Sequence, residues 1–348
     1  MKKIVKGNNN LIFGNGNVTV QSMTNLPVTD VLGTEKQIRA LVSNGCDIVR
    51  IALPNLQSVQ CFRQIRNLFP SLPLVADVHF DARIAIAAME QGCDKIRLNP
   101  GNVPVKQLDK VIDCAKACST VIRIGVNGGS VSKEWLQKCN GDKIEALVQS
   151  LGEYVAMFES RNFDKIVLSA KSSSVRETVE LNRKIAQKFA YPIHLGVTEA
   201  GPVEQGVIKN SIGIGALLLD GIGDTIRVSL TGNPVDEVLA AKHILRAVGL
   251  KEGVEFVSCP KCGRCSIDLE TVATEIFAYV KDLPCAIKIA VMGCEVNGPG
   301  ECADADLGIA GMGGKFVFFK KGEKFKIADA DNGVELFKRE IDTLITSK

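Results

Sequence analysis

The alternation of two hydrophobic patterns between residues 18 and 248 constrains the fold of this chain more than any other feature. Short runs rich in β-branched residues predict buried strands, and the longer amphipathic stretches between them predict helices. We place the strands at 18–21, 48–51, 74–77, 95–98, 121–126, 165–169, 194–197 and 225–228. We place the helices at 33–44, 59–68, 84–91, 105–117, 144–161, 175–189, 203–219 and 235–248. Eight strand–helix units in succession favour a closed (β/α)8 TIM-like barrel over an open doubly wound sheet.

A second, smaller domain is predicted after a linker at 249–253, where glycines end the last barrel helix. Its expected strands lie at 254–257, 287–292, 307–310, 315–319 and 325–327, and its helices at 269–280 and 334–346. A chain of 348 residues has room for a barrel of about 250 residues and such a module. The sequence therefore predicts a barrel at 1–248, with a hairpin in the first 17 residues that plugs its floor, and an α+β domain at 249–348.

Two loops of the smaller domain carry the residues of a predicted iron–sulfur site. The first loop holds Cys259 and Cys262, a spacing that brings two thiolates round one turn toward one metal. The second holds Cys294 and, after Asn297-Gly298-Pro299-Gly300, Glu301. Gly and Pro force a chain reversal there, which folds Glu301 back toward the metal. Because clusters are normally held by four thiolates, three thiolates and one carboxylate would leave one iron with an exchangeable ligand.

Other thiol sites stay open on spacing alone. One is a structural zinc on Cys259, Cys262, Cys294 and Cys302, although a zinc ribbon would repeat Cys-x-x-Cys in its second half. Another is a redox-active Cys-x-x-Cys, but no thioredoxin-like βαβ pattern surrounds it. Cys265 makes a second, overlapping Cys-x-x-Cys, and we interpret it as a bystander.

The carboxyl ends of the predicted barrel strands, where such barrels keep their chemistry, carry an unusual set of polar residues. The set comprises Arg50, Asp77, His79, Arg97, Asn99, Arg123, Asn127, Ser169, Lys171, Thr198, Glu199, Arg227 and Ser229. Five of these side chains are cations, whereas only Asp77 and Glu199 are carboxylates. Uncompensated buried charge is costly, and guanidinium groups match phosphate oxygens. The set therefore predicts a phosphate or diphosphate ester as the ligand, with Gly125 leaving room for it.

Other candidates near the mouth have less specific interpretations. We interpret His79 and His194 as core histidines in preference to proton donors. Trp135 and the polar loop at 128–130 are expected to form a rim or lid.

The composition argues against several partners. The net charge is +3, which gives no reason to expect a nucleic acid or a membrane surface. No run of about 18 apolar residues predicts a membrane span, and the basic N-terminus lacks the apolar segment of a signal peptide. Twelve cysteines without an export signal predict a reducing compartment, here the cytoplasm, with metal or thiol chemistry in place of disulfides.

Five motifs along the chain are similar to those of a known family. They are Val20-Gln21-Ser22-Met23-Thr24-Asn25, Ala76-Asp77-Val78-His79-Phe80-Asp81, Arg97-Leu98-Asn99-Pro100-Gly101-Asn102, Arg123-Ile124-Gly125-Val126-Asn127 and Asn297-Gly298-Pro299-Gly300-Glu301. Together they resemble the family of 4-hydroxy-3-methylbut-2-en-1-yl diphosphate synthase, over essentially the full length and in its compact two-domain bacterial form.

This resemblance implies an oxidoreductase with a [4Fe–4S] cluster on Cys259, Cys262, Cys294 and Glu301. The implied reaction is reductive ring opening of 2-C-methyl-D-erythritol 2,4-cyclodiphosphate to 4-hydroxy-3-methylbut-2-enyl diphosphate, in non-mevalonate isoprenoid biosynthesis. Flavodoxin or ferredoxin would supply electrons one at a time. The family's diphosphate contacts fall on Arg50, Arg97, Arg123 and Lys171, and its other substrate-site residues on Asp77, Asn127, Glu199, Arg227 and Ser229. We expect Glu199 or Asp77 to manage protons and Glu301 to be the exchangeable ligand.

The linker between the domains predicts a shared site. The eighth helix, about 14 residues or roughly 20 Å long, runs back to the barrel floor, and a linker of about five residues spans at most roughly 17 Å. We therefore expect a head-to-tail homodimer in which each cluster domain caps the barrel of its partner. Two rivals are a zinc-stabilised protein that senses a phosphorylated metabolite and a phosphate-ester aldolase. The aldolase is disfavoured because no strand-end lysine is obviously desolvated for Schiff-base chemistry.

Overall fold

The computed structural model describes residues 2–78, 81–98, 104–127, 133–296, 300 and 302–347, with the backbone alone at Val105 and Asn127. The chain divides into two compact units, Met1–Val248 and Gly249–Lys348. Each unit has its own sheet and its own hydrophobic core.

Parallel strands form the sheet of the first unit, an eight-stranded ring. They are β3 (Thr19–Met23), β4 (Ile48–Ala52), β5 (Leu74–Asp77), β6 (Lys95–Leu98), β7 (Val121–Asn127), β8 (Ile166–Lys171), β9 (His194–Leu195) and β10 (Thr225–Ile226). Their order along the sheet is β8-β7-β6-β5-β4-β3-β10-β9. A parallel bridge between Leu168 and Ile193 joins β8 to the residue before β9 and closes the ring. The predicted (β/α)8 barrel is therefore confirmed.

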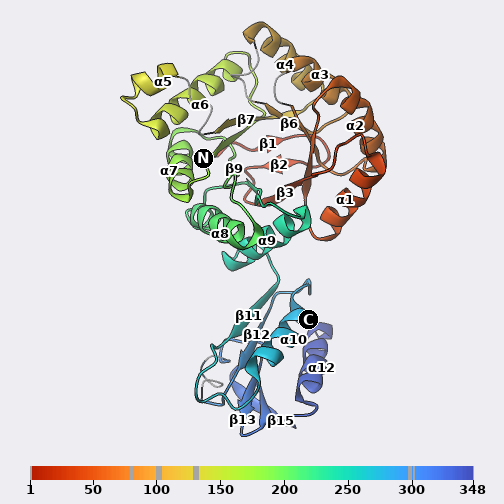
Figure 1. Ribbon diagram of the computed structural model, residues 1–348, viewed down its shortest axis with the longest axis vertical. Helices are drawn as coiled ribbons and strands as arrows, with labels where there is room; N and C mark the ends of the chain where they lie inside the picture. The colour runs from red at the N-terminus through yellow and green to blue at the C-terminus, as the bar shows by residue number, and fades with distance from the viewer. Residues whose placement is uncertain are drawn as a thin grey trace. The chain divides into compact units, whose positions relative to one another are not determined.

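Helices cover the outside of this barrel (Figure 1). The predicted ones are α1 (Val31–Ser43), α2 (Leu56–Leu68), α3 (Ala82–Glu90), α4 (Val105–Ala117), α6 (Lys143–Glu159), α7 (Val175–Lys188), α8 (Val203–Leu219) and α9 (Pro234–Ala247). Side chains cap several first turns: Asp30 accepts the amide of Gly33, and Ser174 accepts the amide of Glu177. Such caps satisfy amide groups that have no partner inside the helix.

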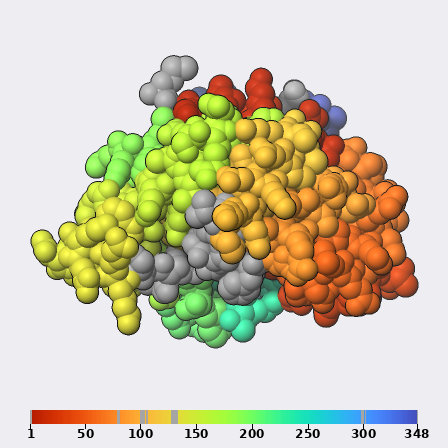
Figure 2. All heavy atoms as spheres, turned by 90° about the horizontal axis from the view of Figure 1, so that it is seen from above, coloured from red at the N-terminus to blue at the C-terminus, as the bar shows by residue number. Residues whose placement is uncertain are grey.

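One short helix, α5 (Lys133–Lys138), was not predicted. It projects from the outer side of the barrel, as the yellow segment shows in two views (Figures 1 and 2). The indole Nε1 of Trp135 on α5 donates to Glu153 Oε2 of α6, 2.9 Å away. This outer contact gives no support to the prediction that Trp135 forms a rim or lid, and residues 128–130 lie outside the described residues.

The N-terminal hairpin plugs the barrel floor, as predicted. Its strands β1 (Val5–Lys6) and β2 (Ile12–Phe13) pair antiparallel. A separate apolar cluster joins the hairpin to residues near the amino ends of four barrel strands: Val5, Leu11, Phe13, Ile48, Val75, Val121 and Val167. The floor is therefore closed by hydrophobic packing, which leaves the opposite end of the barrel for a ligand.

In its described residues, the second unit has a five-stranded sheet and the helices α10 and α12, the predicted α+β arrangement. Its elements are β11 (Val254–Ser258), α10 (Leu269–Val280), β12 (Ile287–Met292), β13 (Leu307–Met312), β14 (Lys315–Lys320), β15 (Glu323–Asp329) and α12 (Gly333–Thr346). The strands follow chain order in the sheet: β11, β12 and β13 are parallel, and β14 and β15 antiparallel. Ile276, Phe318 and Phe337 are fully buried in its core. Within the described part of the chain, we find no helix with the length and apolarity needed to cross a membrane.

Candidate active site

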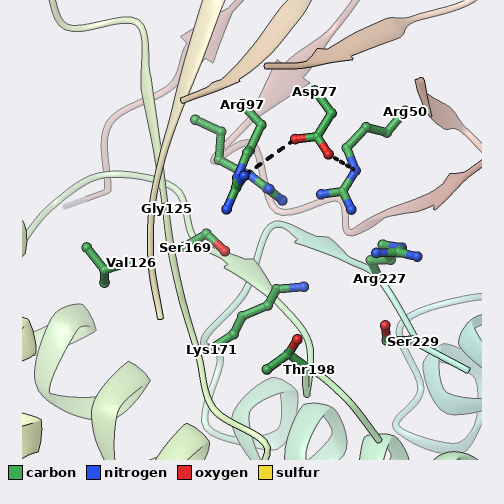
Figure 3. A pocket seen from close by; sticks show the side chains of 11 residues that line it. Arg50, Asp77, Arg97, Gly125, Val126, Ser169, Lys171, Thr198, Arg227 and Ser229 are labelled. Carbon is green, nitrogen blue, oxygen red and sulfur yellow. Dashed lines mark ion pairs between the residues drawn. The ribbon is translucent and has the colours of Figure 1, made fainter. Parts of the chain in front are cut away.

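A cavity of about 150 Å³ opens at the carboxyl end of the barrel strands (Figure 3). It is lined by Arg50, Asp77, Arg97, Arg123, Gly125, Val126, Ser169, Lys171, Thr198, Arg227 and Ser229. All five cations predicted at the mouth therefore share one cavity. They come from β4, β6, β7, β8 and the residue that follows β10, so closure of the barrel is what brings them together.

Strand register explains which of these residues are neighbours. Arg97 on β6 is aligned with Asp77 on β5 and with Arg123 on β7. Gly125, two residues beyond Arg123, is aligned with Ser169 on β8. Because alternate residues of a strand face the same side, Arg123 and Gly125 both face the barrel interior. Gly125 has no side chain, and so leaves the space that the sequence predicted for a ligand.

Two carboxylates pair with part of this cation set. Asp77 lies between two guanidinium groups, with Oδ2 3.9 Å from Arg50 Nε and Oδ1 3.7 Å from Arg97 Nη1 (Figure 3). Glu237 Oε1 accepts a hydrogen bond from Arg227 Nη2 at 3.3 Å. These contacts orient three arginines, but two carboxylates do not balance five cations.

The remaining imbalance appears in the pKa values of the basic groups. Burial and the neighbouring Arg227 lower the pKa of Arg50 to about 10. Burial, followed by Arg50 and Arg97, holds the pKa of Arg123 well below its usual range. Within the described residues, Nε and Nη1 of Arg123 have no hydrogen-bond partner, although the residue is only 4% exposed. Two buried donors of one guanidinium group therefore lack an acceptor among the described residues, and an anionic ligand would provide one.

Glu237 is a residue of this site that sequence analysis missed. It lies on α9 and is 4% exposed. Besides Arg227, it accepts the amide of Leu230 at 3.1 Å, and the hydroxyl of Ser22 at 3.1 Å. The sequence could have revealed Glu237, because it is an acidic residue on the core-facing side of a helix, four residues before the buried Ala241.

Lys171 corrects one sequence-based argument. Burial, followed by Arg123 and Arg227, holds the pKa of Lys171 well below its usual range. A Cβ placed on Gly196 would lie 2.5 Å from Lys171 Nζ, so the glycine provides the space that the ammonium group occupies. A desolvated strand-end lysine is therefore present, and the stated objection to an aldolase was wrong.

Four other predicted residues lie outside the cavity lining or outside the described part of the chain. Glu199 is exposed and follows the lining residue Thr198, with a left-handed φ of 53° that is uncommon for a residue with a side chain. Asn127 ends β7, but its side chain is not described. His79 and Asn99 lie outside the described residues.

The two cysteine loops start at one edge of the second sheet, because β11 and β12 are neighbouring parallel strands. The amide of Gly293 donates to Cys259 Sγ at 3.2 Å, and Gly293 directly precedes Cys294. The amide of Ser266 donates to the carbonyl of Gly293 at 2.9 Å. The first loop therefore folds back on the start of the second, so that Cys259 lies beside the residue that precedes Cys294.

The other thiols differ in their surroundings. Cys262 is exposed. Cys265 Sγ donates to the carbonyl of Ile267 at 3.2 Å, a contact that favours the bystander interpretation. Cys302 is fully buried in an apolar cluster with Met292 and Phe319, an environment that disfavours the zinc alternative in which it is a ligand.

The two cysteine loops can be compared with an iron–sulfur site by the chemistry of their ligand atoms. Glu301 and residues 297–299 lie outside the described residues, and the described ones include no group of three or more His, Cys, Asp or Glu suited to a metal ion. Cys259, Cys262 and Cys294 supply thiolates, soft ligands that suit iron–sulfur clusters or zinc better than hard cations. The two loops also start at the same sheet edge. By ligand type and by strand position, these residues fit an iron–sulfur cluster.

Known proteins match both units of this chain. The family model described as GcpE TIM-barrel domain matches residues 2–242, and the GcpE protein C-terminal domain matches residues 255–343. The 4-hydroxy-3-methylbut-2-en-1-yl diphosphate synthase (flavodoxin) of Caldanaerobacter subterraneus subsp. tengcongensis is 48% identical over 343 residues, 98% of this chain and 96% of the relative. The Fusobacterium nucleatum subsp. nucleatum protein of that name is 47% identical over 348 residues, 99% of this chain and 98% of the relative.

Solved structures with a similar barrel are more distant in sequence. A dihydropteroate synthetase with a bound product has a TM-score of 0.53 at 13% identity, covering 71% of this chain and 99% of that chain. The Yersinia pestis dihydropteroate synthase has a TM-score of 0.52 at 14% identity, covering 72% of this chain and 99% of that chain. At such identity the likeness shows the barrel fold alone.

Proposed function

This chain belongs to the GcpE family, and from that membership we propose that it is a flavodoxin-dependent 4-hydroxy-3-methylbut-2-en-1-yl diphosphate synthase. It would reductively open 2-C-methyl-D-erythritol 2,4-cyclodiphosphate to 4-hydroxy-3-methylbut-2-enyl diphosphate, in non-mevalonate isoprenoid biosynthesis. The observation that carries the proposal is the mouth cavity, where, among the described residues, three of the five cations form ion pairs with two carboxylates, Asp77 and Glu237. Such an excess of positive charge suits a doubly phosphorylated substrate.

Substrate binding is assigned to the cavity residues. Arg50, Arg97, Arg123 and Lys171 would hold the diphosphate, and Arg227, Ser229 and Asn127 would contact the rest of the substrate. Asp77 already lies within 4 Å of two guanidinium groups, so we assign it the role of orienting Arg50 and Arg97. That leaves Glu199, exposed beside the cavity residue Thr198, as the carboxylate that manages protons.

The cysteine loops would hold the cofactor. Cys259, Cys262, Cys294 and Glu301 are the proposed ligands of a [4Fe–4S] cluster, which when bound supplies the electrons for reductive ring opening. Support comes from the soft donor set, from the sheet edge that both loops share and from the family. The backbone amide that donates to Cys259 Sγ would stabilise a thiolate there.

A head-to-tail homodimer remains part of the proposal. The 14 residues of α9 lead toward the barrel floor, because helices of such a barrel run antiparallel to its strands. The short linker to β11 gives the second unit little reach toward the mouth of its own barrel. Each cluster domain is therefore proposed to serve the partner's barrel. The cytoplasmic location and ferredoxin as a second electron donor also stay predictions.

Anaerobic purification followed by metal analysis and a turnover assay tests the function. We expect about four irons and four sulfides per chain, and conversion of the cyclic diphosphate with reduced flavodoxin. Cys259→Ser should lose iron and activity. Cys302→Ser should keep both if its burial means a core role, and Cys285→Ser is a matched control in the same unit. A colourless protein with one zinc and no turnover would favour the metabolite sensor instead.

A further inference from the structure

Beneath the mouth cavity, the barrel interior holds a layer of polar side chains that the proposed reaction does not use. The layer consists of Gln21, Lys95, His194 and Thr225, each 1% exposed or less. Thr225 on β10 is in parallel register with His194 on β9. Lys95 Nζ reaches from β6 to Gln21 Oε1 on β3, 2.9 Å away, and lies 4.6 Å from the ring centroid of the floor residue Phe13. The layer therefore lies between the apolar plug and the mouth.

His194 is the least satisfied member of this layer. Neither of its ring nitrogens has a hydrogen-bond partner in the described part of the chain. Gln21 Nε2 and Thr225 Oγ1 also lack partners there. Buried polar atoms of this kind are uncommon in folded proteins, and their presence calls for an explanation such as a catalytic role or bound water. His194 therefore has unused hydrogen-bonding capacity inside the barrel.

The cations that act on His194 come mainly from the substrate site. They are Lys171 on β8, Arg123 on β7, Lys95 on β6 and Arg50 on β4. Burial, followed by these cations with Lys171 foremost, holds the pKa of His194 well below its ordinary value. Lys171 Nζ lies against Gly196, two residues after His194. Burial and these cations therefore favour the neutral imidazole in the free protein, and three of the four cations belong to the proposed diphosphate site.

We propose that His194 takes up a proton when a diphosphate binds in the mouth, and so adds a further cation beneath the bound phosphates. The inference rests on the proposed function, since the ligand must place its negative charge on Arg50, Arg123 and Lys171. Bound phosphate would offset the repulsion from these cations, which adds to the larger effect of burial on the imidazolium form. The two ring nitrogens without partners are then both available as donors to internal water.

The proposed substrate makes the coupling measurable. Each phosphorus atom of the cyclic diphosphate carries a single, strongly acidic hydroxyl group, so the ligand itself does not titrate near neutral pH. Any proton taken up on binding therefore comes to the protein. Because the complex would bind the extra proton, affinity should fall as pH rises through the titration of His194 in the complex.

Titration calorimetry of the full-length chain with the cyclic diphosphate, in two buffers of different ionisation enthalpy, tests the inference. We expect proton uptake that increases as the pH is lowered, and its loss in His194→Gln. The control His243→Gln changes an exposed histidine on α9 and should keep the uptake. Ring-nitrogen NMR is well suited to a chain with 3 histidines, and should show His194 change from imidazole to imidazolium on binding.

The outcomes separate the inference from the function that it rests on. No binding of the cyclic diphosphate would overturn the proposed function itself. Binding without proton uptake, or an imidazole that stays neutral in the complex, would overturn the inference alone. Uptake that persists in His194→Gln would assign the proton to Lys95 or Lys171 and so reject His194. If His194→Gln does not fold, the NMR spectrum of the wild-type complex still decides.

Discussion

Arg123 illustrates at the scale of one residue how binding and stability oppose each other in this protein. Its side chain is buried, and two of its nitrogen donors have no partner among the described residues. A buried charge with incompletely satisfied donors destabilises the fold, and the field of Arg123 also disfavours the charged forms of Lys171 and His194. The same arrangement favours an anion, because the cost of desolvating the cation has already been met during folding.

Arg123→Met should therefore stabilise the free protein while it removes substrate binding. Replacing a poorly paired buried ion by an apolar side chain of similar length is expected to gain roughly 1–3 kcal/mol. Affinity for the cyclic diphosphate should fall about 100-fold or more, as for loss of a buried charge contact. Urea unfolding and calorimetry measure the two effects. Arg183→Met, at an exposed ion pair with Asp220, should change neither; a destabilised Arg123→Met protein would contradict this account.

The two carboxylates predicted to manage protons should behave differently. Asp77→Asn removes the charge that orients Arg50 and Arg97, so we expect a higher KM with a smaller effect on kcat. Glu199→Gln keeps the shape of an exposed side chain beside the cavity, so we expect a kcat at least tenfold lower with KM little changed. Steady-state kinetics across pH distinguishes these patterns. The reverse assignment of effects would give the proton role to Asp77.

Helix α8 shows at the scale of an element how glycine sets the packing of a barrel layer. Gly213 and Gly215 lie two residues apart on this helix. A Cβ on Gly213 would lie 2.7 Å from Val197 Cγ2, just before the cavity residue Thr198, whereas a Cβ on Gly215 would meet nothing within 4 Å. Gly213 therefore allows α8 to pack closely on the residues that follow β9, whereas Gly215 has no such role.

Alanine substitutions at the two glycines should have opposite effects on stability. Gly215→Ala should stabilise the protein by about 0.5–1 kcal/mol, because glycine in a helix costs conformational entropy. Gly213→Ala should destabilise it by roughly 1–3 kcal/mol through overpacking against Val197, and should lower substrate affinity by moving Thr198. Urea unfolding and ligand titration of both variants give the comparison. Equal stabilisation by both would show that the Val197 contact relaxes freely.

Assembly is decided at the scale of the whole molecule. A cavity in the first unit and cysteine loops in the second are two halves of one proposed catalyst, joined by the residues between α9 and β11. In a head-to-tail dimer each catalytic site takes one half from each chain, whereas in a monomer one chain must supply both.

Mixing two inactive variants distinguishes these arrangements. Arg123→Ala removes a barrel contact, and Cys259→Ser removes a cluster ligand. If sites are shared, random reassociation gives heterodimers with one intact site of two, so activity should recover to about a quarter of wild type. Mass spectrometry of the mixture verifies that subunits exchange. Exchange without recovered activity would mean that each chain completes its own site.

Most of the fold was predictable, because helices and strands depend on local patterns. The pattern of apolar residues predicted the ends of each of the eight barrel helices to within three residues of the observed ends. For α4 and α8 the predicted and observed ends are the same. The short α5 was missed, since its six residues include no buried side chain and so no amphipathic pattern. The predicted strands at 194–197 and 225–228 each extended two residues too far, because β9 ends at Leu195 and β10 at Ile226, and the chain then enters the segments that line the cavity.

The sequence by itself determined the order of the elements, and with it which cations stand at strand ends, since both follow from the spacing of residues along a local backbone. Only the tertiary structure decided which charges share a desolvated space. It brought Glu237 from α9 to Arg227, Lys171 over Gly196, and Lys95 and His194 into one buried layer. These contacts join segments far apart in the chain, and the energy of a charge depends on the groups and the water around it, which no local pattern records.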